Sequence, residues 1–306
     1  PRSPNHKAAD DTARTEGRAL HVHAKVLALM TAICFGLNPV LLKLGFARKG
    51  RSDVAVVIGL AITVPCYLLI APLVGGISFA HLTLPALVGF ILGGLFGGGI
   101  GRRWMYLAVE RIGASPAAAI KNSAPVITTA LAIVVLGERV TLLHWLAIAT
   151  IVAGITLVTW RRGLGLRQLL NVGVLAALGS ALSYGVRPLF LKYGLDAANL
   201  PLTGALIGAI AALVYAGALT TSSELWFGLR ERSLGLFAAS GILQALGFLA
   251  LTFGLSSEDV SIVYPVTSTA PLFTLLFTAL MLRKTERLSW RIVVGAMAIT
   301  AGVIVL

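Results

Sequence analysis

Long apolar segments recur along the whole chain and constrain its fold more than any other feature. A helix needs roughly 20 mostly apolar residues to cross the hydrocarbon of a bilayer. Because lipid offers no hydrogen bonds to an open backbone, such segments are predicted to be transmembrane helices. Ten of them lie between the charged clusters, at 24–46, 53–74, 84–108, 114–136, 140–160, 170–194, 200–220, 233–255, 260–282 and 288–306.

The composition indicates the same class of protein. The chain is 57% hydrophobic and 12% charged, whereas soluble domains carry roughly 25% charged residues. Its net charge of +13 would suggest a nucleic-acid partner in a soluble protein, but Lys and Arg stand mostly in short loops between the apolar segments. Basic loops set membrane topology. We therefore expect an integral membrane protein in contact with lipid and no nucleic-acid partner, preceded by a polar, disordered tail at 1–23.

The second half of the sequence repeats the first. FGLNPVLLKLG at 35–45 aligns with YGVRPLFLKYG at 184–194, with five identities in the ten positions from Gly36 to Gly45. Later in the chain Ala124-Pro125 aligns with Ala270-Pro271, and Gly154 aligns with Gly302. The sequence therefore predicts an all-α membrane protein with two five-helix repeats, at 24–160 and 161–306.

Charges on matched loops predict that the repeats are inverted. Five is an odd number, so matched loops should lie on opposite membrane faces and their basic residues should not coincide. Three basic residues lie at 48–51, whereas the matched loop at 196–200 has none. Four lie at 283–291, opposite the single Arg139. Taking the basic loops as internal places both chain termini outside.

The same segments resemble a known transporter family. FGLNPVLLKLG at 35–45, ASPAAAIKNSAPV at 114–126 and LGERVTLLHWLAIATIVAGI at 136–155 are similar to segments of EamA-type permeases of the drug/metabolite transporter superfamily. Thr285, where the second Gly-Glu-Arg turn usually has Gly, and charged Arg102-Arg103 depart from that pattern. The resemblance implies transport through a central cavity lined by the first, third and fourth helices of each repeat. It also implies no cofactor and a bacterial inner membrane location.

Positive residues inside the apolar segments are candidates for solute binding. Intramembrane charge costs roughly 2.5–3.5 kcal/mol per residue on insertion scales, so it usually has a function. Arg102, Arg103, Lys121 and Arg187 lie in such segments, and Asn38 aligns with Arg187. Guanidinium groups next to phenols suit a carboxylate or phosphate. For Arg102 and Arg103, reaching out to lipid headgroups is the alternative interpretation. The candidate substrate-binding residues are Asn38, Arg102, Arg103, Tyr106, Lys121, Asn122, Tyr184, Arg187, Tyr264, Thr267 and Ser268.

Prolines and glycines add two local predictions. A helical proline leaves the carbonyl four residues earlier without its usual donor, which is compatible either with a polar cavity or with a packing kink. Gly89, Gly93, Gly97 and Gly101 recur every four residues and predict one smooth helix face, suited to tight packing or to sliding. The helical prolines are Pro39, Pro125, Pro188, Pro265 and Pro271.

These patterns favour a secondary transporter for a small anionic or zwitterionic solute, as a monomer or homodimer. All twelve Asp and Glu residues fall in the tail, in loops or at helix ends. Because proton-driven carriers often use a buried carboxylate, exchange or facilitated flux is the favoured mode. Alternatives are an intramembrane enzyme, for which the sequence offers no nucleophile with a base and no metal-ligand cluster, and a non-transporting scaffold or channel.

Overall fold

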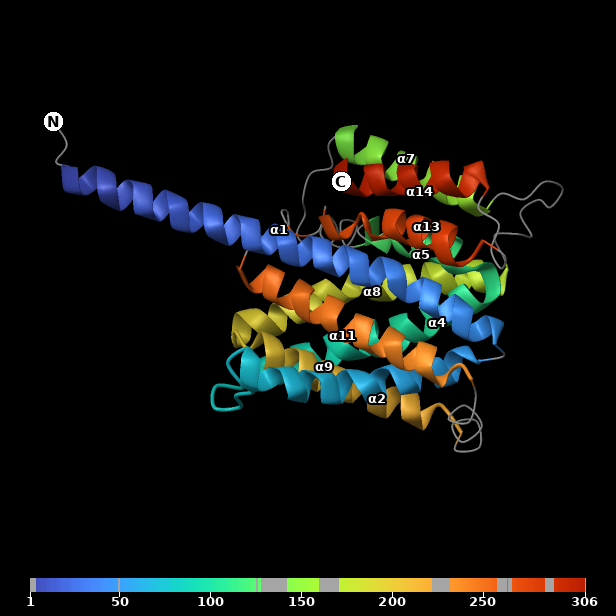
Figure 1. Cartoon of the computed structure of the whole chain (residues 1–306), viewed down its shortest axis with the longest axis horizontal. Coiled ribbons are helices and arrows are strands. Elements are labelled where there is room, and N and C mark those ends of the chain that lie inside the picture. Colours follow the sequence, from blue (N-terminus) through green and yellow to red (C-terminus); the bar gives the residue numbers. More distant parts are fainter. Residues whose placement is uncertain are drawn as a thin grey trace.

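The computed structural model describes residues 4–48, 50–124, 126–127, 142–159, 171–221, 232–257, 263, 266–283 and 289–305. In these ranges every regular element is a helix (Figure 1). The elements are α1 (Pro4–Ala47), α2 (Ser52–Ile70), η1 (Ala71–Leu73), α3 (Leu84–Gly94), η2 (Leu95–Gly101), α4 (Arg102–Ile112), α5 (Ala114–Lys121), α7 (Leu142–Thr159), α8 (Val172–Ala197), α9 (Pro201–Ala218), α11 (Leu234–Ser257), α13 (Ala270–Met281) and α14 (Trp290–Val305).

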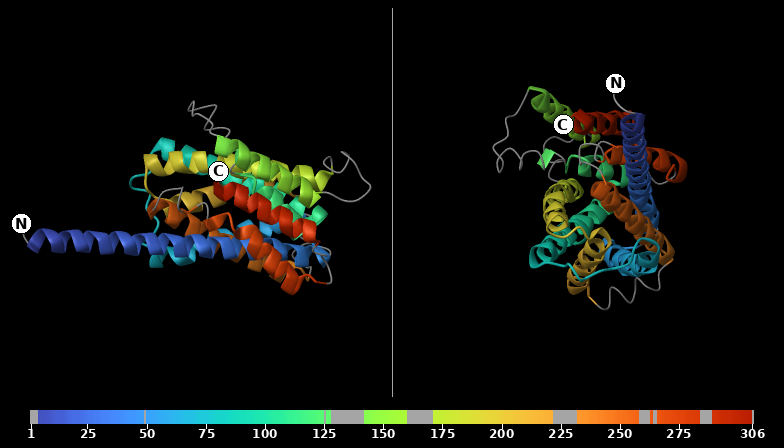
Figure 2. Two further views of the ribbon diagram at one scale, coloured as in Figure 1. Left: turned by 90° about the horizontal axis from the view of Figure 1, so that it is seen from above. Right: turned by 90° about the vertical axis from the view of Figure 1, so that its left-hand side faces the viewer.

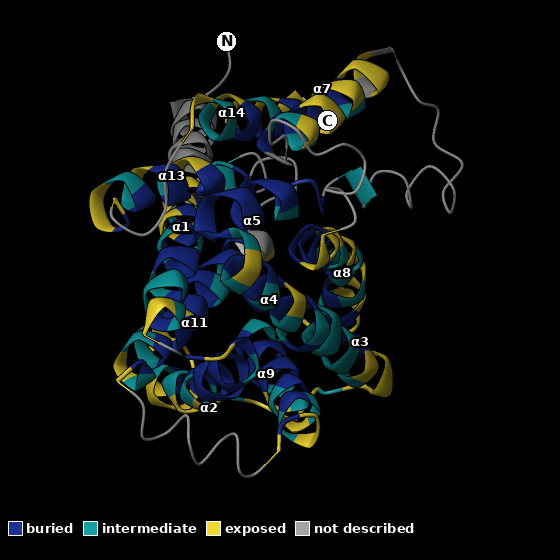
Figure 3. Cartoon of the chain, turned by 90° about the vertical axis from the view of Figure 1, so that its right-hand side faces the viewer, coloured by how far each residue is buried: buried dark blue, intermediate teal, exposed yellow. Residues whose placement is uncertain are grey.

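The bundle presents an apolar surface, as a membrane protein must. Six of the described helices are long and apolar enough to cross a bilayer, and Trp145–Val158, Ala270–Met281 and Trp290–Val305 are shorter apolar helices. Large apolar side chains such as Leu69, Trp145 and Val214 lie on the outside. Buried and exposed residues alternate along the helices (Figure 3), and many of the buried ones are small or polar. In lipid, apolar side chains can face outward without cost, and helices associate through small residues. The chain is an all-α integral membrane protein.

The first helix begins well before the first apolar segment. Helix α1 begins at Pro4 and continues without a break to Ala47, and its first half projects from the bundle (Figure 1). The sequence of this half contains several Ala, Arg, Lys and Glu residues, which are good helix formers. Adding a residue to an existing helix is far easier than starting a new one. The membrane segment therefore extends its helix into the polar tail.

The third apolar segment is continuous but contains a π-helix. Between α3 and α4, η2 has the sequence LFGGGIG, and the Arg102 N–H bonds to the carbonyl of Gly97, five residues earlier. Four glycines in seven residues provide few side chains to support a regular α-helix. A π-helical turn changes the direction in which the following side chains point, and such turns are frequent at functional sites.

The predicted glycine face packs against α8. A Cβ on Gly89 would meet the backbone of Gly194, and one on Gly93 would meet Leu191. A Cβ on Gly97 would meet the side chain of Arg187. The face therefore brings the π-helical segment into close contact with the helix that carries Arg187.

Matched residues make matched contacts between the repeats. A Cβ on Gly154 would lie 2.7 Å from Ile299 Cγ1, and one on its counterpart Gly302 would lie 2.6 Å from Ile151 Cγ1. Such exchange of partners is the signature of a two-fold axis. The start of α7 lies beside the end of α14, so these helices are antiparallel (Figure 2). An axis relating antiparallel membrane helices lies in the membrane plane, which is the geometry of inverted repeats.

Candidate functional site

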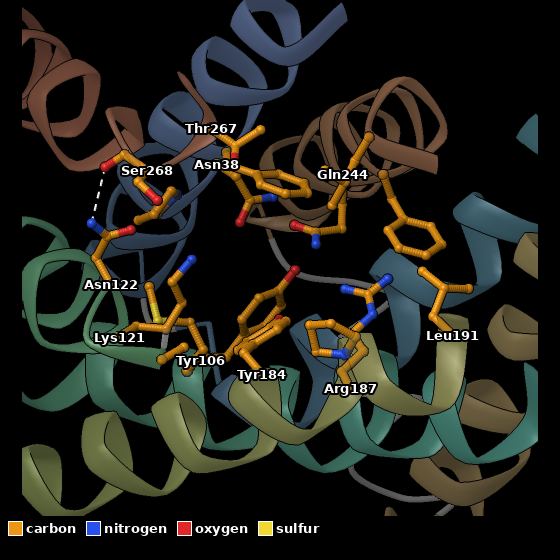
Figure 4. A pocket seen from close by; sticks show the side chains of 17 residues that line it. Asn38, Tyr106, Lys121, Asn122, Tyr184, Arg187, Leu191, Gln244, Thr267 and Ser268 are labelled. Carbon is orange, nitrogen blue, oxygen red and sulfur yellow. Dashed lines mark hydrogen bonds between the residues drawn. The ribbon is translucent and has the colours of Figure 1, made fainter. Parts of the chain in front are cut away.

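A buried cavity of about 110 Å³ lies between the two repeats. Helices α1, α4 and α5 of the first repeat and α8 and α11 of the second provide most of its wall (Figure 4). The lining residues are Phe35, Asn38, Pro39, Met105, Tyr106, Lys121, Asn122, Ala124, Tyr184, Arg187, Pro188, Leu191, Gln244, Phe248, Leu251, Thr267 and Ser268.

Lys121 is placed in the cavity by the end of a short helix. Helix α5 ends at Lys121, and the chain turns at Asn122, whose N–H bonds to the carbonyls of Ala118 and Ala119. The Lys121 amine points into the space above Tyr184 (Figure 4), and its Nζ lies 5.3 Å from the centre of that ring. This is a cation–π contact, which stabilises the charge without neutralising it.

Arg187 faces the same cavity from α8. Its guanidinium carbon lies 3.8 Å from the centre of the Phe248 ring. The side chain passes over Gly97, where a Cβ would collide with its Cδ and Nε. A glycine at this position of η2 is therefore required for Arg187 to reach the cavity.

Two interrupted helices meet at the cavity. Thr267 and Ser268 are the repeat counterparts of Lys121 and Asn122. Thr267 is helical, and Ser268 begins the turn directly before α13 starts at Ala270. The amide of Asn122 donates to the carbonyl of Ser268 over 2.9 Å (Figure 4). The amino terminus of α13 therefore lies near Asn122, the residue after Lys121, and a helix amino terminus favours an anion. Pro125, Pro265 and Tyr264 lie outside the described residues.

Asn38 fixes the opposite wall. Its Nδ2 donates to the carbonyl and hydroxyl oxygens of Ser240, at 2.9 and 2.8 Å. The Tyr106 hydroxyl lies 3.4 Å from the same Ser240 hydroxyl. Helices α1, α4 and α11 are thus joined by buried polar contacts next to the cavity.

The predicted site residues separate into three groups. Arg102 lies in an adjoining pocket rather than in the cavity wall. Arg103 is not among the residues that line the cavity. Its Nη2 lies 3.0 Å from Asp53 Oδ1, and 31% of its side chain is exposed. Consecutive helical residues point about 100° apart, so two adjacent arginines cannot share one face. Those that line the cavity are Asn38, Tyr106, Lys121, Asn122, Tyr184, Arg187, Thr267 and Ser268.

Helix α11 contributes residues that the sequence analysis missed. Gln244 and Phe248 line the cavity one helical turn apart. Gln244 is the only amide or charged side chain in the segment 233–255, and this isolated polarity is the signal that could have identified it. Phe248 carried no such signal, because a phenylalanine in a membrane helix is unremarkable in sequence.

Comparisons with known proteins agree with this architecture. Nineteen solved chains match the structure, and one of them, described as "Crystal structure of protein", has a TM-score of 0.61. That match covers 92% of this chain and 95% of the other at 18% identity, and it shows the fold alone. No curated protein matches the sequence. A family model described as "EamA-like transporter family" matches twice, at residues 24–160 and 171–306. The chain belongs to the EamA-like transporter family.

Proposed function

We propose that this protein is a secondary transporter that moves a small anionic or zwitterionic organic solute, such as an amino-acid-like compound, by alternating access. The observation that carries the proposal is the pair Lys121 and Arg187, one from each repeat, facing a single buried cavity. Among the described residues that line it, none is Asp or Glu. Two cationic side chains on one cavity favour an anionic ligand, and a solute carboxylate or phosphate can form charge-assisted hydrogen bonds with both.

The cavity chemistry also suits the rest of a small solute. Phe35, Met105 and Phe248 provide apolar surface, and Gln244 and Thr267 provide polar groups that can fix its orientation. The volume of about 110 Å³ is below the roughly 300–1,000 Å³ of pockets for drug-sized ligands. We infer a solute of few non-hydrogen atoms.

Inverted repeats give a physical basis for alternating access. Rocking of one repeat against the other around a fixed central site opens the site to each face in turn. Because no acidic residue lines the described cavity wall, we propose exchange or facilitated flux rather than proton coupling.

Counterflow in proteoliposomes tests this proposal. A thermal-shift screen of amino acids and small carboxylic acids identifies a solute that stabilises the purified protein. Vesicles preloaded with that unlabelled solute are then expected to accumulate the labelled form transiently. A channel would equilibrate the label without the transient excess, and a scaffold would take up none. Either result, or a screen in which only cations stabilise the protein, contradicts the proposal.

We further propose that the bundle end carrying Arg48 and Arg111 faces the cytoplasm. The ends of α1 and α4 lie together there, since Lys43 donates to the carbonyls of Val109 and Glu110. At the other end Leu29 and Ile304 line one groove, which places the carboxyl terminus beside the outer part of α1. Under the positive-inside rule both termini are then external.

Cysteine labelling measures this orientation. In a variant in which Cys34 and Cys66 are alanine, we expect Ser78→Cys to react with a membrane-impermeant maleimide in intact cells. Ser78 lies at the end of the bundle opposite Arg48, where it exchanges hydrogen bonds with Thr203. Arg48→Cys is expected to react only after the membrane is opened. The reverse pattern would show that the termini are internal.

A further inference from the structure

A second, smaller pocket lies beyond the cation–π pair of Arg187 and Phe248. Its volume is about 30 Å³, and it shares Arg187, Leu191, Gln244 and Phe248 with the central cavity. Glycines of α3, η2 and α9 form much of its remaining wall, so backbone rather than side chains bounds the space. A water needs roughly 10–15 Å³ by this measure, so the pocket has room for one small ion or the head of a carboxylate.

Arg102 enters this pocket without a full set of partners. The residue is 5% exposed, and its Nε and Nη1 atoms are buried with no hydrogen-bond partner. The guanidinium lies close to the Tyr184 side chain. Arg102 directly follows the π-helical segment, which sets the direction of its side chain. Two buried donor atoms of a permanently charged group therefore lack a hydrogen-bond partner in a residue that lines this pocket.

A bound anion would pair with the buried positive charge of Arg102. A buried charge is retained only when it is paired or hydrogen-bonded. None of the described residues that line the pocket is Asp or Glu, and Asp53 is engaged by Arg51 and Arg103 at the bundle edge. Tyr67, which is 1% exposed, lines the same pocket from α2. A phenol and a guanidinium are both hydrogen-bond donors that suit one small anion.

We propose that the Arg102 pocket is a second anion-binding site, which takes a chloride ion or the carboxylate group of a solute. It stands in series with the central cavity, with Arg187 and Phe248 between the two. The carboxylate form rests on the proposed transport function, whereas chloride binding does not. Occupancy of this pocket neutralises the interior next to Arg187 and so governs how strongly Arg187 attracts an anion in the central cavity.

Chloride-35 NMR on the full chain in detergent tests the site. Exchange of chloride with a protein site broadens the chloride resonance, and titration gives the affinity. We expect the wild-type protein to broaden the line and Arg102→Gln to weaken binding roughly tenfold or more, since hydrogen bonds to charged groups contribute about 1.5–3 kcal/mol. Arg103→Gln removes the same charge one residue away, at a partly exposed ion pair, and is expected to bind chloride as the wild type does.

Two further variants test the anion site if Arg102→Gln fails to fold. Tyr67→Phe preserves shape and is expected to weaken chloride binding by roughly fivefold through loss of one donor. Arg102→Lys keeps the charge but loses the fork of donors, so weakened binding is expected there too. Chloride binding that is absent from the wild type, or unchanged in Arg102→Gln, Arg102→Lys and Tyr67→Phe, overturns the proposal.

Separate measurements distinguish chloride from a carboxylate as the ligand of the Arg102 pocket, and the anion-site proposal from the transport proposal. Displacement of chloride by acetate identifies the site as one for carboxylates as well, and lack of displacement identifies it as a site for chloride. Lys121→Ala is expected to abolish solute counterflow while the chloride signal persists. If the wild type shows no counterflow but an Arg102-dependent chloride signal, the transport proposal fails and the anion site stands.

Discussion

Lys121→Ala is expected to weaken solute binding by about a hundredfold and to abolish counterflow. Among the described residues that line the cavity, Lys121 and Arg187 are the cationic ones, so a bound carboxylate has few other cationic partners. Removing one member of a buried charge pair costs roughly 2–5 kcal/mol, much of it from the charge left unpaired. Binding of the screened solute by calorimetry gives the loss directly.

Arg187→Gln should reproduce the loss for the same reason. Because Lys121 and Arg187 face one cavity, they act on the same anion, and the double variant is expected to lose less than the sum of the two single losses. Two cations at unrelated sites would instead give additive losses. A double-mutant cycle in solute affinity therefore tests whether the two residues share a ligand.

Arg103→Gln is the matched control for charge. It also removes one positive charge from the bundle, but Arg103 pairs with Asp53 and is 31% exposed. Such a pair contributes about 0–1 kcal/mol, so solute affinity should stay within about twofold of the wild type. Stability gives a second check on Lys121→Ala, since removing a buried cation from the empty carrier should not lower its melting temperature. Equal loss of binding in Arg103→Gln and Lys121→Ala would point to a general charge effect and contradict the site.

The sequence contains enough information for the repeats and for most of the cavity. Positive charge inside an apolar segment made Lys121 and Arg187 candidates, because such a charge is costly in the membrane and usually has a function. The sequence alone could not show that Arg102 lines a pocket whereas Arg103 pairs with Asp53. That distinction depends on the π-helical turn at Leu95–Gly101, which no periodicity analysis anticipates. The helical extension of α1 was also missed, because polar composition does not show that a neighbouring membrane helix can continue.

The cavity also depends on the distance between helices α3 and α9. Gly94→Ala is expected to increase that distance and to destabilise the protein. A Cβ on Gly94 would overlap the Cα, carbonyl carbon and oxygen of Gly208. These are backbone atoms, so α3 and α9 must move apart rather than rotate a side chain. Overpacking costs about 1–3 kcal/mol, and a loss of roughly 2–12 °C in melting temperature follows. Thermal unfolding of the purified protein in detergent measures it.

The repeat relation predicts a second glycine contact of the same kind in the other half of the bundle. Gly59 and Gly241 are the repeat counterparts of Gly208 and Gly94, and a Cβ on Gly241 would lie 2.7 Å from the Gly59 carbonyl oxygen. Gly241→Ala should therefore also destabilise the protein, by less than Gly94→Ala because its overlap is smaller. Gly217→Ala, in α9 itself, meets nothing within 4 Å and should be neutral or stabilising, since alanine favours a helix over glycine by roughly 0.5–1 kcal/mol. If Gly94→Ala melts with Gly217→Ala, helices α3 and α9 are not in backbone contact, and the cavity wall they support is misplaced.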